Sequence, residues 1–171
     1  MVQKKDWLIM AVRDASIDPR LLESARKQFR EKGFLGAQLS DICKDVGVTT
    51  GAIYNRYKGK EGLFEAVVKD TVDSMNSILE EAKTVDPNKL SDKELIGVWD
   101  NTEENTRLWN KRLMDMKDGL ELVLKCSEGT KYSHFHEQWL EKMSDIDYDY
   151  LKALQDRELA DKKISRKELH V

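Results

Sequence analysis

Residues 49–60 carry hydroxyl, amide and basic side chains and contain no acidic residue. Their positive charge comes from Arg56, Lys58 and Lys60. Hydroxyl and basic groups of this kind donate hydrogen bonds to phosphate oxygens, and small polar side chains fit against base edges. The segment is therefore a candidate for contact with a polyanion, although its charge alone favours a solvated basic surface.

The charge of the whole chain is unevenly distributed. The 171 residues include 29 Lys and Arg against 32 Asp and Glu, a net charge of −3. Residues 1–70 hold 13 basic and 10 acidic residues, a net of +3, whereas residues 71–171 hold 16 and 22, a net of −6. Such asymmetry between halves indicates that one half is a candidate for contact with a polyanion.

The elements that must position residues 49–60 are helices. Asp18-Pro19 predicts a helix start and Gly33 its end, giving a helix over 19–32. Apolar spacing predicts short helices over 39–46 and 49–57, with Gly47 in the turn and Thr49 as the cap of the second, followed by a long helix over 60–83. Two short helices joined by a tight glycine turn indicate a helix-turn-helix.

The rest of the chain is also predicted to be helical. Capping boxes at Ser91–Glu94 and Ser165–Glu168 predict helix starts. The expected helices are 92–111, a short apolar one over 120–126 after a kink or short break at 115–119, 132–159, and one from Arg166. No segment shows convincing strand alternation, so the predicted fold class is all-α.

In a helix-turn-helix the second helix enters the major groove, which is about 12 Å wide. The candidates for base edges are Thr50, Ala52 and Asn55, with Gly51 allowing close approach of the backbone. The candidates for phosphate are Tyr54, Arg56 and Lys60. Lys60 also begins the next helix, whose N-terminal N–H groups favour phosphate.

The stretch Leu22–Val68 resembles the DNA-binding domain of the TetR family of transcriptional repressors. The matching positions are Ala25, Phe29, Gly33-Phe34, Asp41-Ile42, Gly47-Val48-Thr49, Gly51, Tyr54, Tyr57, Lys60-Glu61 and Leu63-Phe64. The resemblance implies contacts with a double-stranded DNA operator from Thr49, Thr50, Gly51, Tyr54, Asn55 and Lys60. It also implies a C-terminal helical domain that binds a small-molecule effector and forms a homodimer. Separately, the two cysteines, Cys43 and Cys126, form no CxxC pair and no secreted-type framework, so we expect a cytoplasmic protein.

Some positions depart from the family pattern. Gln38 stands where the family usually has Thr or Ser as a cap that touches phosphate, so Ser40 or water is a possible substitute. Asn55 and Arg56 replace the usual His or Tyr, which leaves the operator sequence open. Residues 1–18 are longer than a typical arm; Arg13 could enter a minor groove, but a mobile tether is the simpler interpretation.

The predicted organisation has three parts: an arm over 1–18, the helix-turn-helix domain over 19–65, and an effector-binding and dimerisation domain over 66–171. The long helix from Lys60 joins the last two. The resemblance implies two further long helices after this point, which pair with a second subunit. We therefore expect the C-terminal domain to be shortened, which puts dimerisation in question.

Aromatic and apolar side chains in the C-terminal half are candidates for an effector pocket or for ordinary core. They are Trp99, Trp109, Phe135, Trp139 and Met143. A metal site from His134, His136 and Cys126 is disfavoured, because histidines two residues apart on a helix point to different faces. Cys43 fits a buried small apolar position, and we expect no metal or cofactor.

The leading hypothesis is a DNA-binding regulator released from its operator by a small effector. The alternative is a helical ligand-binding or interaction module whose operator binding is weak or lost. An enzyme is disfavoured, since the chain shows no phosphate-binding glycine loop, metal-ligand cluster or nucleophile motif. The longest apolar run, residues 7–12, is far shorter than the roughly 20 residues of a membrane span.

Overall fold

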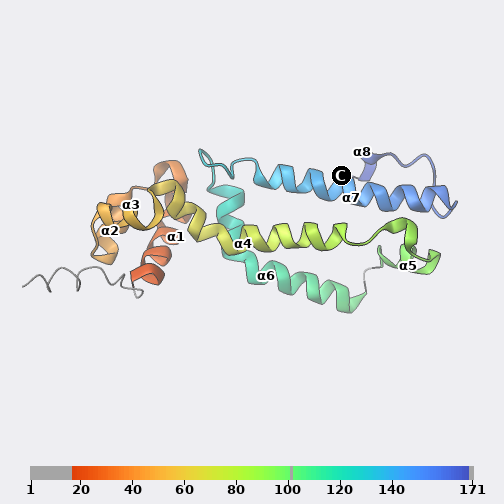
Figure 1. Ribbon diagram of the computed structural model, residues 1–171, viewed down its shortest axis with the longest axis horizontal. Helices are drawn as coiled ribbons and strands as arrows, with labels where there is room; N and C mark the ends of the chain where they lie inside the picture. The colour runs from red at the N-terminus through yellow and green to blue at the C-terminus, as the bar shows by residue number, and fades with distance from the viewer. Residues whose placement is uncertain (1–16, 101, 170–171) are drawn as a thin grey trace, which may run out of the picture. The chain divides into compact units, whose positions relative to one another are not determined.

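A computed structural model describes residues 17–100 and 102–169, and every α-helical element of these ranges is shown in Figure 1. The helices are α1 Ile17–Gly36, α2 Leu39–Val46, α3 Thr50–Tyr57, α4 Lys60–Lys83, α5 Asp92–Gly97, α6 Glu103–Lys125, α7 Phe135–Asp156 and α8 Arg166–Leu169, with a 3-10 turn at Pro87–Lys89. The all-α prediction is confirmed. Arg13 and most of the predicted arm lie outside the described residues.

The chain divides into two compact units, Met1–Val67 and Val68–Val171. The division falls close to the boundary at 65/66 that the sequence suggests, and it lies inside α4. Helix α4 therefore starts in the first unit and continues in the second. Along the described ranges, none of the helices combines the length and the apolar character that crossing a membrane requires.

Glycines set the helix ends of the first unit. Gly33 has φ +68°, so the regular helix that starts at Ile17 is interrupted there, and one further turn follows to Gly36. Gly47, with φ +76°, ends α2 and donates its N–H to the carbonyl of Cys43 at 2.9 Å. Both positions need the left-handed conformation that glycine adopts without steric cost. The predicted ends at Gly33 and Gly47 are thus confirmed, apart from the extra turn.

Three phenylalanines form the centre of the first unit. The rings of Phe29 and Phe64 are 5.0 Å apart edge to face, and Phe34 lies 5.5 Å from Phe64. The fully buried side chains around them are Leu21, Ala25, Ala37, Ile42, Ile53 and Leu63. Because each helix contributes to this cluster, the cluster fixes α2 and α3 on the scaffold of α1 and the first turns of α4.

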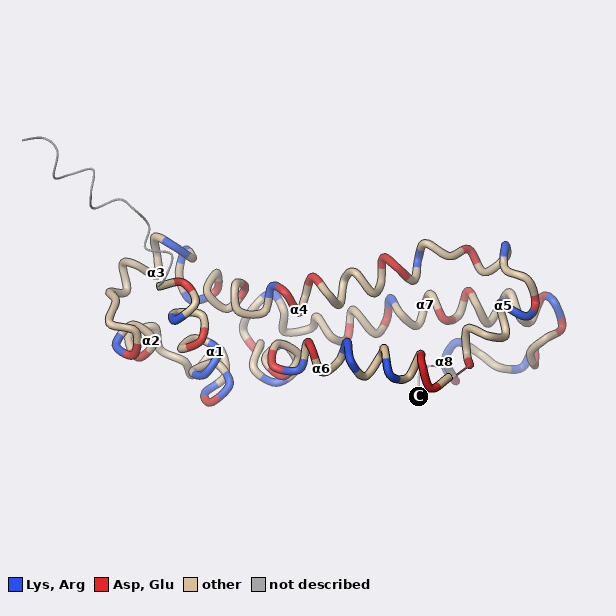
Figure 2. Tube along the Cα trace, turned by 90° about the horizontal axis from the view of Figure 1, so that it is seen from below, with Lys and Arg blue, Asp and Glu red and all other residues tan. Residues whose placement is uncertain are grey.

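The second unit is built on α4, α6 and α7. Helices α4 and α7 and the first part of α6 run along a common direction in both views, and the last part of α6 turns away from it (Figures 1 and 2). The indole N–H of Trp139 on α7 donates to the carbonyl of Met75 on α4 at 2.8 Å. Helix α6 comes close to α4 at Gly119, where a Cβ atom would lie 1.9 Å from Oγ1 of Thr71. A second core cluster, Leu95, Tyr150, Ala153 and Leu154, joins α5 to α7.

Two sequence predictions for this unit differ from the structure. The helix from Asp92 ends at Gly97 instead of continuing to residue 111, and α6 starts afresh after Thr102, whose hydroxyl accepts from the N–H of Asn105 at 3.2 Å. The kink or short break expected at 115–119 is not a break, because α6 is continuous through Gly119 and includes the apolar segment from 120, although the helix changes direction along its length (Figure 1). The helix predicted over 132–159 is observed as Phe135–Asp156, and the start at Arg166 is confirmed.

The contact between Gly119 and Thr71 generates a stability prediction. We expect Gly119→Ala to lower the free energy of unfolding by about 1–3 kcal/mol, because overpacking forces α6 away from α4. Gly97→Ala is the matched control, since the nearest atom to its Cβ is 3.9 Å away. Chemical denaturation measures both. A Gly119→Ala variant as stable as the Gly97→Ala variant would contradict the close approach.

Candidate nucleic-acid interface and effector pocket

Helix α3 has one buried and one exposed face. Ile53 is fully buried in the core of the first unit, and the side chain of Tyr54 is 57% exposed. The exposed positions of this helix and its cap are Thr49, Thr50, Gly51, Tyr54 and Asn55, with Ala52 half-buried. The structure therefore brings together, on one short helix, most of the residues that the sequence selects for base and phosphate contacts.

Both ends of α3 are fixed by local hydrogen bonds. The hydroxyl of Thr49 accepts from the N–H of Ala52 at 3.3 Å, so Thr49 is the cap that the sequence predicts. At the other end Lys58 adopts φ +63° and donates its N–H to the carbonyl of Tyr54 at 3.0 Å. These caps satisfy backbone groups that a helix of eight residues would otherwise leave unpaired.

The carboxylate of Asp18 fastens the end of α3 to the start of α1. Its Oδ1 accepts from Nη1 of Arg56 and from the hydroxyl of Tyr57, each at 3.0 Å. The Arg56 side chain is only 13% exposed in this arrangement. Arg56 is therefore a poor candidate for a phosphate contact, because its guanidinium is engaged inside the domain.

Lys60 is the first residue of α4, and its ammonium group lies against residues of the first unit. The Nζ atom donates to the carbonyl of Leu35 at 3.1 Å and lies 4.7 Å from the ring centroid of Phe34. Burial lowers the pKa of Lys60 below its ordinary value. The side chain is half-buried, so a phosphate would have to compete for its ammonium group with the carbonyl of Leu35.

Gly62 determines how closely α4 follows α3. A Cβ at this position would lie 1.7 Å from the carbonyl oxygen of Tyr57, which is backbone and has little freedom to move. Neither the role of Gly62 nor the role of Asp18 beyond helix capping is predicted from the sequence. A single glycine in the first turn of a helix is a weak signal, and no local spacing pairs Asp18 with residues 38 and 39 positions away.

The two candidates before α3 lie at the start of α2. Gln38 is the N-cap residue and makes no side-chain capping bond, as its residue type suggests, and Ser40 is exposed in the first turn. Helix α2 is held on α1 by two contacts from α1: Lys32 to Asp41 at 2.9 Å, and Arg20 to the carbonyl of Val46 at 3.2 Å. Contacts of Gln38 and Ser40 with DNA stay predictions.

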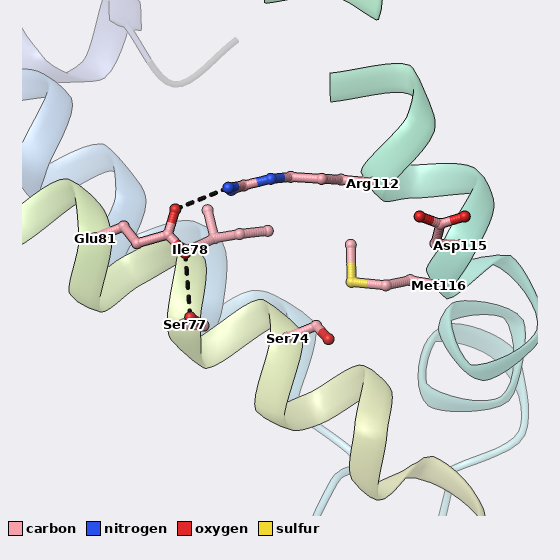
Figure 3. Close-up of a pocket in the computed structure, with 7 residues that line it drawn as sticks. All are labelled: Ser74, Ser77, Ile78, Glu81, Arg112, Asp115 and Met116. Carbon is pink, nitrogen blue, oxygen red and sulfur yellow. Dashed lines mark hydrogen bonds and ion pairs between the residues drawn. The ribbon is translucent and has the colours of Figure 1, made fainter. Parts of the chain in front are cut away.

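The second unit contains a pocket between α4 and α6 (Figure 3), with a volume of about 250 Å³. It is lined by Ser74, Ser77, Ile78, Glu81, Arg112, Asp115 and Met116. Arg112 reaches from α6 to α4, where its Nη2 lies 2.9 Å from Oε2 of Glu81. This ion pair and the hydrogen bond to Ser77 lower the pKa of Glu81.

The five sequence candidates for an effector site are spread over the second unit, and none of them lines this pocket. Trp99 follows α5, Trp109 is on α6, and Phe135, Trp139 and Met143 are on α7. Trp99 and Trp109 are 43% and 42% exposed, whereas the other three are half-buried. Effector contact by these residues stays a prediction.

The first unit is similar to known regulators. The family described as "Bacterial regulatory proteins, tetR family" matches residues 21–67. The HTH-type transcriptional regulator UidR of Escherichia coli K12 is 37% identical over 49 residues, which are 29% of this chain and 25% of UidR. The HTH-type negative transcriptional regulator IcaR of the Staphylococcus aureus biofilm operon icaADBC is 32% identical over 60 residues, 35% of this chain and 32% of IcaR.

The matched part of the chain thus spans only a quarter to a third of the length of these relatives. A solved structure of a proposed fatty acid metabolism regulator from Clostridium perfringens superposes with a TM-score of 0.57, at 16% identity. It covers 88% of this chain and 77% of the other, which shows a shared fold. Residues 21–67 are therefore similar to the domain that the tetR family of bacterial regulatory proteins shares.

Proposed function

We propose that the protein is a sequence-specific transcriptional repressor that places α3 in the major groove of an operator. The observation that supports it most directly is the division of α3 into a buried face at Ile53 and an exposed face of small and polar residues. A recognition helix needs this division, because its outer residues must fit between two phosphate backbones. The IcaR relative is a negative regulator by name, which supports repression.

The proposed contacts fall into two groups. Thr50, Ala52 and Asn55 face base edges, and Gly51 allows the backbone to approach them. Thr49, Tyr54 and Lys60 contact phosphates and orient the helix without reading sequence. Because its guanidinium is engaged with Asp18, we assign Arg56 a positioning role in place of the phosphate contact that its charge suggests.

Repression and release follow from two states of the protein with different affinity for DNA. A dimer places two recognition helices about 34–36 Å apart, one turn of DNA. A small effector bound in the second unit releases the operator only if it binds the non-binding state more tightly. Such a regulator acts on chromosomal DNA in the cytoplasm.

Salt dependence tests the DNA contacts. We expect the logarithm of the protein's affinity for duplexes selected from a random pool to fall steeply with the logarithm of the salt concentration. Lys60→Ala should reduce the magnitude of this slope by about 0.9, the value for one phosphate contact. Asn55→Ala should cost about 1–3 kcal/mol on selected duplexes and little on random DNA. Lys93→Ala, exposed on α5, is the matched control.

A chain that binds no duplex at low salt would contradict the repressor function and favour the helical ligand-binding module. If Lys60→Ala left the slope of log affinity against log salt unchanged, Lys60 would not contact a phosphate, but the proposed function would still stand.

A double-mutant cycle tests the positioning role of Arg56. Removing one partner of a half-buried hydrogen-bonded pair leaves the other unsatisfied, so Arg56→Ala should lower the free energy of unfolding by about 1–3 kcal/mol. Asp18→Ala should cost a similar amount, and the double variant less than the sum of the two. Additive effects of the two substitutions on the free energy of unfolding would contradict the coupling. If Arg56→Ala also reduced the salt dependence of DNA affinity, Arg56 would contact a phosphate after all.

The solution mass tests the assembly. We expect two chains per selected duplex, because one half-site alone gives too few contacts for the affinities of about 10⁻⁸–10⁻¹¹ M that are typical of specific operators. Sedimentation of the complex at rising protein concentration measures the stoichiometry. One chain per selected duplex at saturation would contradict the dimer mechanism.

A further inference from the structure

We propose that the pocket between α4 and α6 binds a small amphipathic organic cation, an alkylammonium or arylalkylammonium compound. The assignment rests on the proposed function in one respect: it identifies the ligand that would act as effector. The binding itself is a property of the second unit and is measured without DNA.

The pocket has an apolar floor and a charged rim. Ile78 from α4 and Met116 from α6 face one another across it, as Figure 3 shows. The Met116 side chain is 7% exposed and Ile78 is half-buried. The charged groups are Glu81, Arg112 and Asp115. An occupant therefore needs an apolar body and one charged end.

The same side of α6 continues the apolar surface beyond the pocket. Leu108 and Trp109 precede Arg112 by four and three residues, and Leu113 precedes Met116 by three, so these side chains are neighbours on the helix surface. They are 52%, 42% and 37% exposed. Large apolar side chains that are exposed next to a pocket indicate a surface whose burial by a ligand is energetically favourable. The apolar tail of a ligand would extend along this row.

The charges of the pocket select a cation. Glu81 and Asp115 carry two negative charges against the one positive charge of Arg112. Arg112 already pairs with Glu81 at 2.9 Å, so an anion would have to displace Glu81 and would meet the charge of Asp115. Asp115 has a loose partner in Lys111, with Nζ 4.0 Å from its Oδ2. An ammonium group pairs with Asp115 and Glu81 without leaving a carboxylate unpaired.

The size and the side chains of the pocket fit the same ligand class. A volume of about 250 Å³ lies just below the range of about 300–1,000 Å³ that is typical for drug-sized ligands. The hydroxyl groups of Ser74 and Ser77 line the wall on α4, and the polarisable thioether of Met116 is a favourable neighbour for an organic ligand.

Calorimetric titration with three matched probes tests the proposal on the full chain: octylammonium, octanoate and octanol. We expect octylammonium to bind most tightly, octanol more weakly and octanoate weakest. Tighter binding of octanoate, equal binding of all three, or no binding of octylammonium would each overturn the assignment.

Variants locate the site. Asp115→Asn should weaken octylammonium about fivefold, the upper value for an exposed ion pair, and leave octanol unchanged. Ile78→Ser should weaken both probes. Glu104→Gln, an exposed charge on the same helix outside the pocket lining, is the control and should change neither. An Asp115→Asn variant that binds octylammonium as the parent does would place the cation elsewhere and overturn the site.

The ligand proposal and the repressor proposal can be contradicted independently of each other. A chain that binds octylammonium at this site but no duplex DNA keeps the ligand site and loses the repressor function. A chain that binds selected DNA but not octylammonium loses the ligand class only.

Discussion

The position of helix α3 depends on one carboxylate, that of Asp18. Helix α3 is eight residues long, too short to be stable in water by itself, and its surroundings must hold it. Ile53 attaches its inner face to the core, but the rotation of its last turn is set where Asp18 accepts from Arg56 and Tyr57. The exposed positions can face a groove because this contact directs the other side of the helix inward.

The first unit follows closely from its sequence because each of its signals is local. Gly33 and Gly47 end helices where a left-handed residue is required, and Thr49 caps α3 through a contact three residues away. The bounds 60–83 of α4 follow from a long apolar period with clear ends. What the sequence could not reveal is which basic residue is engaged internally, because the partner of Arg56 is 38 positions away.

The second unit is less predictable, because its decisive contacts join distant helices. Gly119 resembles a helix breaker in the sequence, yet it lies inside α6. A glycine is required there because the contact with Thr71 leaves no room for a Cβ atom. Thr102 caps the start of α6, but the sequence pattern over 92–111 predicts one continuous helix. The aromatic residues suggested a pocket, whereas the observed one is formed by an ion pair, two serines, an aspartate and two apolar side chains.

The contact of Gly119 with Thr71 makes α6 a lever within the second unit. The side chain of Thr71 packs directly against the backbone of Gly119, so a change in the angle between the two helices would turn α6 about this contact as a fulcrum. From Gly119 to Glu103 the helix extends about 24 Å at about 1.5 Å per residue, and residues 102–115 include no buried side chain. A tilt of about 6° at the fulcrum would move the free end by about 2.5 Å, on the same geometry. A ligand wedged beside Met116 would thus produce its largest displacement at the far end of the helix, well away from the atoms that it touches.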